Sequence, residues 1–286
     1  MEGIVKKNQN GYYSLVNGQN ETYMAKARGL LKRGRPILVG DRVEYRVNSD
    51  GTATILSIHE RTSELFRPPV ANINELVITA SIMSPNFNQF ITDTMLVLAG
   101  HAGVTPIVCI TKTDLAREEA CHIAEAYAGA GYASFAVSLW LPDTVEELKQ
   151  YLHGPAIAFT GPSGAGKSSL INRLLGKEQF LAGNISEKTK RGKNTTRHAE
   201  LAFFKEHAFL MDTPGYTSLS IQAMEAKELA SYFPEFHEVS QSCRFTDCRH
   251  MEEPGCAVQK AALDGDISGA RYESYRRMYS DLQGKK

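Results

Sequence analysis

The stretch Ala156-Ile-Ala-Phe-Thr-Gly161-Pro-Ser-Gly-Ala-Gly-Lys167-Ser168 decides the fold of this 286-residue chain. Its first half has the apolar pattern of a buried β-strand, and its second half has the spacing Gly-x-x-x-x-Gly-Lys-Ser. A helical pattern over residues 169–175 follows directly. This order of strand, loop and helix predicts a phosphate-binding loop in an α/β fold, and a glycine-rich turn without a ligand is the alternative.

The loop suits a polyphosphate for physical reasons. Glycines let backbone N–H groups approach the phosphates, and the N-terminus of the following helix adds a favourable dipole. Lys167 can reach the outer phosphates, where we expect it to serve catalysis, and the Ser168 hydroxyl can bind magnesium. The expected nucleotide contacts here are Gly161, Ser163, Gly164, Ala165, Gly166, Lys167, Ser168 and Ser169.

A second motif, Thr111-Lys112-Thr113-Asp114, follows an apolar run at the strand end where an α/β sheet binds ligands. The Asp114 carboxylate can accept hydrogen bonds from guanine N1–H and the exocyclic amine, whereas adenine offers no such pair of donors. We therefore expect Thr111, Lys112 and Asp114 to bind guanine. Asn is commoner than Thr at the first position, so Thr111 predicts one weaker orienting contact. The tetrapeptide alone also fits a surface turn.

Other positions complete the expected nucleotide site. Ser138 ends an apolar run, and we expect its backbone N–H to meet guanine O6. The segment Asp212-Thr-Pro-Gly215 follows an apolar strand pattern, so Asp212 can hold magnesium through water and the Gly215 N–H can sense the γ-phosphate. The polar segment 192–198 lies before it. We expect this segment to supply a second magnesium-binding hydroxyl, that of Thr196, with Thr195 as the other candidate. A plain turn and a flexible basic loop are the respective alternatives.

The order of these motifs is the reverse of that in an ordinary GTPase, because the guanine motif precedes the phosphate loop. The segment Thr144-Val-Glu-Glu147 resembles a capping box that starts a helix ending near Gly154, and the strand before the phosphate loop follows at once. Domain termini often lie close together at the surface, so joining them and reopening the chain elsewhere is tolerated. The pattern predicts a circularly permuted GTPase domain of the α/β class.

Four metal-binding side chains follow this domain, with the spacing Cys243-x4-Cys248-x-His250-x5-Cys256. Together they can complete a closed tetrahedral zinc site, which predicts a structural zinc ion, one per chain. Cys248 and His250 are two positions apart, which favours a looped knuckle over a helix. Cys109 and Cys121 lie in apolar or helical patterns and are expected to be inert buried thiols. A disulfide framework is not expected, because the count of five cysteines is odd and no signal peptide is visible.

Five short β-patterned runs over residues 3–58 predict an N-terminal barrel of the oligonucleotide-binding (OB) type. Residues 1–68 contain 11 Lys/Arg and 7 Asp/Glu, a local net charge of +4 (11 − 7) in a chain of zero formal net charge. This excess favours an RNA phosphate surface at Lys26, Arg28, Lys32, Arg33 and Arg35. The alternative is a solvated loop on an ordinary barrel.

The C-terminal residues Tyr272, Tyr275, Tyr279 and Leu282 recur with helical spacing and predict a packed helix face. Arg271, Arg276 and Arg277 then lie largely on other faces, where we expect them to be able to touch RNA.

The length and composition of the chain are consistent with three domains. A chain with 42% hydrophobic and 22% charged residues is expected to be soluble and globular, with room for one α/β core and two small modules. We expect the domains to span residues 1–68, 69–220 and 221–286. Polar residues and Pro106 interrupt the longest apolar region, 95–110, so no membrane span is expected. No signal peptide is visible, which favours a cytoplasmic protein, and we expect a monomer.

With these motifs together, the chain resembles the ribosome small-subunit-dependent GTPase A (RsgA) family. The barrel, the permuted motif order, the Thr-Thr pair at 195–196 and the Cys-x4-Cys-x-His-x5-Cys finger carry the resemblance over nearly the full length. It implies a bacterial cytoplasmic enzyme that hydrolyses GTP to GDP and phosphate with magnesium. It also implies that the enzyme binds the 30S ribosomal subunit and its 16S rRNA late in maturation, is stimulated by that subunit, and then leaves.

Two positions depart from common patterns. The family usually has His immediately before the Thr-Thr pair, where this chain has Asn194, and Tyr216 stands where many GTPases place a water-orienting Gln. We therefore expect slow hydrolysis by the free protein and completion of the site by rRNA or ribosomal proteins. The alternatives are a P-loop ATPase or kinase in which residues 111–114 are coincidental, and a zinc-stabilised rRNA-binding scaffold with a regulatory nucleotide site.

Overall fold

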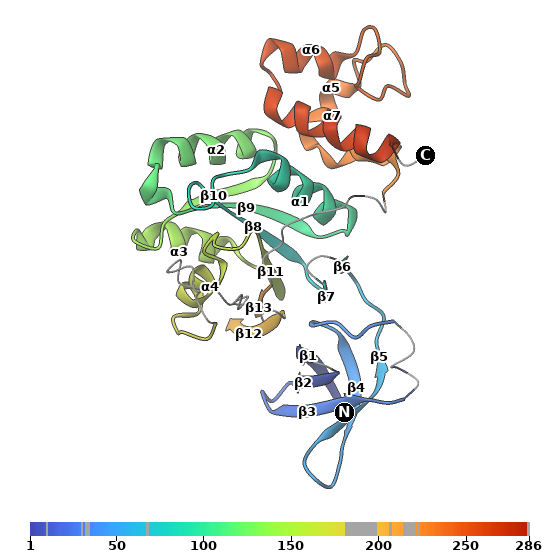
Figure 1. Ribbon diagram of the computed structural model, residues 1–286, viewed down its shortest axis with the longest axis vertical. Coiled ribbons are helices and arrows are strands. Elements are labelled where there is room, and N and C mark those ends of the chain that lie inside the picture. The colour runs from blue at the N-terminus through green and yellow to red at the C-terminus, as the bar shows by residue number, and fades with distance from the viewer. Residues whose placement is uncertain are drawn as a thin grey trace, which may run out of the picture.

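The fold has three parts, seen in a computed structural model that describes residues 1–9, 11–29, 31, 35–66, 69–180, 199–205, 208–213, 221 and 224–284. A β-barrel lies at one end, an α/β domain lies in the middle, and a group of helices lies at the other end (Figure 1). This arrangement agrees with the α/β class and the flanking modules expected from the sequence.

The N-terminal barrel contains all five strands that the sequence predicts. They are β1 (Glu2–Gln9), β2 (Tyr12–Val16), β3 (Thr22–Ala27), β4 (Arg42–Val47) and β5 (Ala53–Ile58). β1 pairs with both β2 and β4, while β3 pairs in parallel with β5, so the order 1-2-3-5-4 closes on itself. Alternate side chains such as Val5, Leu15 and Ile55 fill the interior, which confirms the OB-type barrel.

The central sheet has the order β10-β9-β8-β11-β13-β12. Its strands are β8 (Glu75–Ser81), β9 (Thr105–Thr111), β10 (Ala133–Val137), β11 (Ala156–Thr160), β12 (Glu200–Lys205) and β13 (Ala208–Asp212). Neighbours from β10 to β13 are parallel, and β12 is antiparallel to β13. Helices cover both faces of the parallel strands, which explains why these strands consist mostly of apolar residues.

Helices cover both faces of the sheet. They are α1 (Gln89–His101), α2 (Arg117–Gly129), α3 (Pro142–Tyr151) and α4 (Lys167–Leu175), with a short η2 (Thr113–Leu115) after β9. α1 and α2 pack with Ile78 and Val108 in one apolar cluster, whereas α3 and α4 pack with Val77 and Ile107 in another. Because side chains alternate along a strand, these two clusters lie on opposite faces of the sheet.

The start of α3 differs from our prediction of a capping box at Thr144. The helix begins at Pro142, and its N-cap Leu141 makes no side-chain capping bond. Proline suits the first helical position because its fixed φ matches the helix and its missing N–H is not needed there. The Thr144 hydroxyl instead donates to the Leu141 carbonyl at 2.7 Å and accepts from the Ser138 N–H at 3.1 Å. Thr144 therefore braces the preceding loop.

The barrel joins the central sheet through backbone pairing. β12 pairs with β1 at Glu200 and Lys7, and the same two side chains form an ion pair of 2.7 Å. A hairpin of β6 (Glu64–Phe66) and β7 (Pro69–Ala71) lies between barrel and sheet, at the domain boundary that we predict near residue 68. Gly40 (φ +91°) approaches this hairpin so closely that a Cβ would lie 2.1 Å from the Ala71 carbonyl oxygen.

The C-terminal part contains η3 (Ala226–Tyr232), η4 (Pro234–Phe236), α5 (His237–Ser240), α6 (Ala257–Asp264) and α7 (Gly269–Gln283). Tyr275, Tyr279 and Leu282 of α7 are buried in a cluster that also takes in Val97 of α1. The C-terminal helices therefore pack directly on the α/β domain, beside α1 (Figure 1). None of the described helices combines the length and the hydropathy needed to cross a membrane.

Arg271 is an exception to our expectation that the arginines of α7 are available to RNA. Its side chain is buried, and its guanidinium donates to Asp93 on α1 at 2.5 Å and to Glu235 on η4 at 2.5 Å. It also donates to the Tyr132 hydroxyl at 3.2 Å. The guanidinium carbon lies 5.0 Å from the centre of the Phe233 ring. This buried cluster fastens α7 to the α/β domain.

We predict that Arg271→Ala lowers the free energy of unfolding by about 3–5 kcal/mol, because it leaves the buried Asp93 and the largely buried Glu235 carboxylates without a cation. Urea unfolding measures the change. Arg276→Ala is the matched control on the same helix, since its exposed pair with Glu273 is expected to contribute at most about 0.5 kcal/mol. Arg271→Met keeps most of the volume, so wild-type stability in that variant would contradict an ionic role.

Candidate functional site

The candidate site lies where the parallel strands end. β8, β9, β10, β11 and β13 share one direction, so their carboxyl ends meet at one edge of the sheet. The segments that the sequence singles out follow four of these ends: residues 111–114 after β9, Ser138 after β10, residues 161–169 after β11 and Asp212 at the end of β13. Four motifs far apart in the chain therefore come to one edge.

The glycine loop has a conformation that depends on its glycines. Gly161, Gly164 and Gly166 have φ values of +147°, +82° and +88°, which side-chain-bearing residues rarely adopt. A Cβ on Gly161 would lie 2.1 Å from the Thr79 carbonyl oxygen on β8. Only glycine therefore fits where the loop leaves β11.

Lys167 lies at the start of α4 and folds back over the loop. Its side-chain amine donates to the carbonyls of Gly161 at 2.8 Å and Pro162 at 3.0 Å. Burial lowers the pKa of Lys167, and the nearby Asp212 carboxylate opposes that shift. The amine is thus held against the loop by two neutral carbonyl oxygens, which a charged phosphate can replace.

Ser168 and Asp212 form the expected cation-binding pair. The Ser168 hydroxyl donates to Asp212 Oδ2 at 2.6 Å. Asp212 is buried, and desolvation raises its pKa against the opposing effects of Ser168 and Lys167. Its other oxygen, Oδ1, is buried and has no hydrogen-bond partner among the described residues. A hydroxyl and a carboxylate oxygen without a partner are ligands that Mg²⁺ prefers, so these residues fit magnesium.

Thr111 joins the two nucleotide motifs. Its hydroxyl donates to the Ala165 carbonyl of the glycine loop at 2.7 Å. The weaker contact that we expect from Thr in place of Asn is thus accompanied by a direct bond to the phosphate loop. Lys112 has a left-handed backbone (φ +58°), and its amine donates to the Ser84 carbonyl. Burial lowers the pKa of Lys112.

Asp114 and Ser138 also meet, although the contact differs from the expected one. The Ser138 hydroxyl donates to Asp114 Oδ1 at 2.6 Å. The Ser138 backbone N–H, which we expect at guanine O6, already donates to the Thr144 hydroxyl. The amides of Trp140 and Leu141 are also engaged, whereas the Leu139 N–H has no acceptor among the described residues.

A cavity of about 250 Å³ opens between these segments. It is lined by Thr111, Lys112, Asp114, Leu115, Val137, Leu139, Trp140, Gly166, Ser169 and Leu170. The sequence motifs identify five of these ten lining residues. They miss the apolar ones, because apolar residues that line a cavity have no fixed spacing in the sequence. The most exposed of these is Trp140, with 81% of its surface accessible.

Thr196 and Gly215 lie outside the described residues, as do Thr195, Asn194 and Tyr216. Their expected roles in binding magnesium, sensing the γ-phosphate or positioning water stay predictions.

The cysteine cluster is brought together as the spacing predicts. The ligand atoms of Cys243, Cys248, His250 and Cys256 all lie within 4.8 Å of one another. His250 Nδ1 is 3.6 Å from Cys243 Sγ and 3.5 Å from Cys256 Sγ. Zinc bonds of about 2.3 Å to sulfur and about 2.0 Å to nitrogen, at tetrahedral angles, place such atoms about 3.5 Å apart. The cluster therefore fits zinc.

Contacts from α6 and α7 hold this cluster in shape. The backbone N–H groups of Ala257 and Gln259 donate to the sulfurs of Cys243 and Cys256, respectively. The Tyr272 and Tyr275 hydroxyls donate to the backbone carbonyls of the knuckle, at His250 and Arg249. All four cluster residues lie outside helices except for the cap position of Cys256, which agrees with the looped knuckle.

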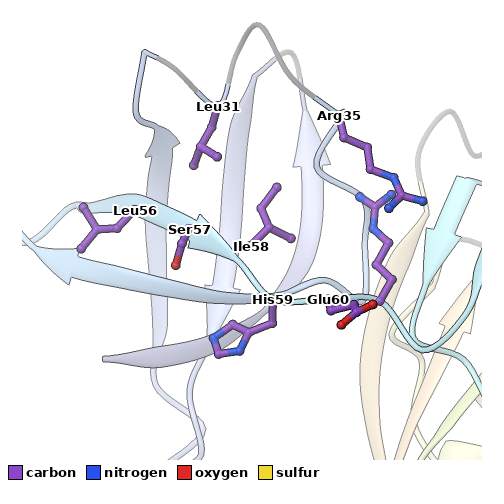
Figure 2. A pocket seen from close by; sticks show the side chains of 8 residues that line it. Leu31, Arg35, Leu56, Ser57, Ile58, His59 and Glu60 are labelled. Carbon is purple, nitrogen blue, oxygen red and sulfur yellow. The ribbon is translucent and has the colours of Figure 1, made fainter.

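Three of the five expected cations of the barrel, Lys26, Arg28 and Arg35, lie among the described residues, and Arg28 is exposed. Lys26 lies over the Tyr12 ring at 4.8 Å, whereas Arg35 pairs with Glu64. Lys32 and Arg33 lie outside the described residues. A cavity of about 550 Å³ on the barrel is lined by Leu31, Arg35, Leu56, Ser57, Ile58, His59, Glu60 and Arg61 (Figure 2). Its lining mixes apolar, acidic and basic side chains and has no glycine-rich backbone, so it does not resemble a phosphate site.

Comparisons with known proteins match the whole chain. A family model described as "RsgA GTPase" matches residues 58–222, and one described as "RsgA N-terminal domain" matches residues 2–55. A Clostridium botulinum (strain Langeland) protein named small ribosomal subunit biogenesis GTPase RsgA is 36% identical, covering 100% of this chain and 99% of that protein. The protein of the same name from Bacillus velezensis is 35% identical, covering 99% and 97%.

Two crystal structures share the fold. YjeQ from Thermotoga maritima has a TM-score of 0.80 and 32% identity, covering 100% of this chain and 99% of that one. YloQ, described as a circularly permuted GTPase, has a TM-score of 0.77 and 31% identity, covering 100% and 96%.

We predict that the purified protein contains one zinc ion per chain and that Cys256→Ala loses it. Because structural zinc contributes about 10 kcal/mol or more, the thermal midpoint is expected to fall by at least about 5 °C. Elemental analysis and calorimetry measure the two effects. Cys121→Ala, on α2, is the matched control and should change neither. A Cys256→Ala protein that keeps its zinc would contradict the assignment.

Proposed function

This chain belongs to the RsgA GTPase family and is a GTP-hydrolysing enzyme, and on that premise we propose how it works in biogenesis of the small ribosomal subunit. The proposal is that GTP binds at the carboxyl edge of the central sheet. The 30S subunit stimulates its hydrolysis late in maturation, and the protein leaves afterwards. Its setting is the cytoplasm, and it acts as a monomer.

The observation that carries the nucleotide assignment is the junction of the two motifs. The bond from Thr111 to the Ala165 carbonyl fixes the end of β9 to the phosphate loop, beside the cavity that Asp114 lines. Asp114 accepts from Ser138 through Oδ1, and because each carboxylate oxygen can accept two hydrogen bonds, both oxygens can still accept from guanine. The Leu139 N–H then meets guanine O6. The segment that would bind the base at Asp114 therefore lies next to the loop that would bind the phosphates at Lys167.

Magnesium would be held by Ser168 directly and by Asp212 through water, with Thr196 as the second hydroxyl ligand and Gly215 sensing the γ-phosphate. When bound, the ion neutralises charge on the phosphates. Lys167 binds the outer phosphates and stabilises the charge that develops during transfer. The buried position of Lys167 supports this role, because a cation in a poorly solvated site interacts strongly with a phosphate.

Activation of the attacking water is assigned to the bound subunit. Asn194 and Tyr216 stand where a His and a Gln are usual, so the chain itself supplies neither group. A group from rRNA or a ribosomal protein would complete the site, as an arginine finger does in other GTPases.

The barrel and the zinc-binding part are proposed to contact 16S rRNA. On β2 and β3, Lys26 over the Tyr12 ring offers a cation and an exposed aromatic face side by side. Phosphate attraction and base stacking use such groups. Structural zinc would keep the knuckle at residues 243–256 in a fixed shape for the same purpose.

The experiment that tests the function is the rate of GTP hydrolysis with and without 30S subunits, using 50S subunits as the control. We expect 30S subunits alone to raise the rate at least about tenfold, because a transition-state group supplied by a partner is worth about 10³-fold or more in other GTPases. Lys167→Ala should abolish the stimulated rate. An unchanged rate with 30S subunits would overturn the proposal, and rRNA binding that ignores the nucleotide would favour the scaffold alternative.

Base selection is tested by Asp114→Asn, because the amide cannot accept both guanine donors. We expect the preference for GDP over ADP, measured by competition against a fluorescent nucleotide, to fall by about tenfold or more. Asp143→Asn removes an exposed carboxylate nearby, in the first turn of α3, and should leave the preference unchanged. Equal competition by ADP and GDP in the wild-type protein would instead favour the ATPase or kinase alternative.

A further inference from the structure

Trp140 is the only tryptophan of the chain, and its exposure is unusual. Its side chain is 81% accessible, although large aromatic side chains are mostly buried in folded proteins. Three other exposed apolar residues lie next to it or on the same cavity: Leu115 at 52%, Leu139 at 37% and Leu141 at 37%. Exposed apolar side chains that gather in this way mark a binding surface more often than scattered ones do.

The backbone holds Trp140 in a fixed place beside the base-reading carboxylate. The Trp140 N–H donates to the Ser138 hydroxyl at 3.2 Å, and the same hydroxyl donates to Asp114 at 2.6 Å. The Leu141 N–H closes the turn on the Ser138 carbonyl at 3.1 Å, and Pro142 then starts α3. The indole therefore projects from a rigid turn and not from a long loop.

Resting on the proposed GTPase function, we infer that Trp140 is a nucleotide-binding residue whose indole covers the purine base. Trp140 and Lys112 line the cavity that also contains Asp114. An indole face stacks on a purine, and such stacking does not depend on which base is present. Trp140 thus supplies affinity for the base, while Asp114 supplies the choice of guanine.

This division of roles has a consequence for selectivity. Loss of the indole should lower the affinities for GDP and ADP by the same factor and leave the ratio of the two affinities unchanged. Loss of the Asp114 carboxylate should change the ratio. A tryptophan exposed for a macromolecular partner would affect neither nucleotide.

Fluorescence gives the first test, because all tryptophan emission comes from position 140. We expect GDP to produce a saturable change in intensity with a blue shift, as the indole leaves water. The midpoint should equal the dissociation constant measured by calorimetry. ADP at the same concentration should produce little change. GDP binding by calorimetry without any change in emission would overturn the inference and leave the proposed function standing.

Affinity gives the second test. Trp140→Ala is expected to lower the affinity for GDP, measured by calorimetry, about tenfold. Trp140→Phe should restore most of that affinity, because the phenyl ring again offers a stacking face. Leu263→Ala is the matched control: it removes an apolar side chain that is 83% exposed on α6. Thermal unfolding of Trp140→Ala should match the wild type, since the side chain makes little buried contact.

Wild-type affinity for GDP in Trp140→Ala would overturn the role of Trp140 in binding the base and leave the GTPase site standing. A wild-type protein that binds no GDP would overturn the GTPase site and, with it, the role of Trp140.

Discussion

Parallel pairing of the strands is the constraint on which the site depends. Because β8, β9, β10, β11 and β13 point the same way, every loop that follows one of them reaches the same edge of the sheet, whatever its place in the chain. The guanine motif can then precede the phosphate loop in the chain while the two motifs keep the same positions at the edge of the sheet. The single bond from Thr111 to Ala165 closes this arrangement. Permuted connections therefore change the chain order but not the site.

A buried cluster of ion pairs attaches the C-terminal helices to the α/β domain. The chain leaves the sheet after β13, so the helices beyond it need their own attachment to the α/β domain. Arg271 provides it by binding Asp93 of α1 and Glu235 of η4 in the buried interface. Desolvation of the charged groups offsets much of their attraction, so the net stabilisation is small, whereas removal of one partner leaves an uncompensated buried charge. The cluster links α7 to α1 and η4.

Local signals were sufficient for much of this structure. The glycine loop, Asp114 and the Cys-x4-Cys-x-His-x5-Cys spacing could be found because each combines rare residue types within a few positions, and the five barrel strands follow alternation between turns. Tertiary contacts could not be found in that way. The burial of Arg271 depends on Asp93 and Glu235, which are distant in sequence. The engaged amide of Ser138 depends on the conformation of the turn that brings Thr144 back to it, and no residue motif marks that conformation. The start of α3 was misplaced because Thr144 bonds backward to the loop, where Pro142 already begins the helix.

The pairing of β12 with both β13 and β1 makes the barrel and the nucleotide-binding sheet one continuous ribbon of hydrogen bonds. β12 is the narrow part of that ribbon, since a single residue pair, Lys7 with Glu200, joins it to β1. It also runs beside the strand that ends in Asp212. β13 holds β12 along five residue pairs, so β12 is attached more extensively to the central sheet than to the barrel. A change in the angle between the barrel and the sheet would therefore be taken up first at the pair of Lys7 with Glu200.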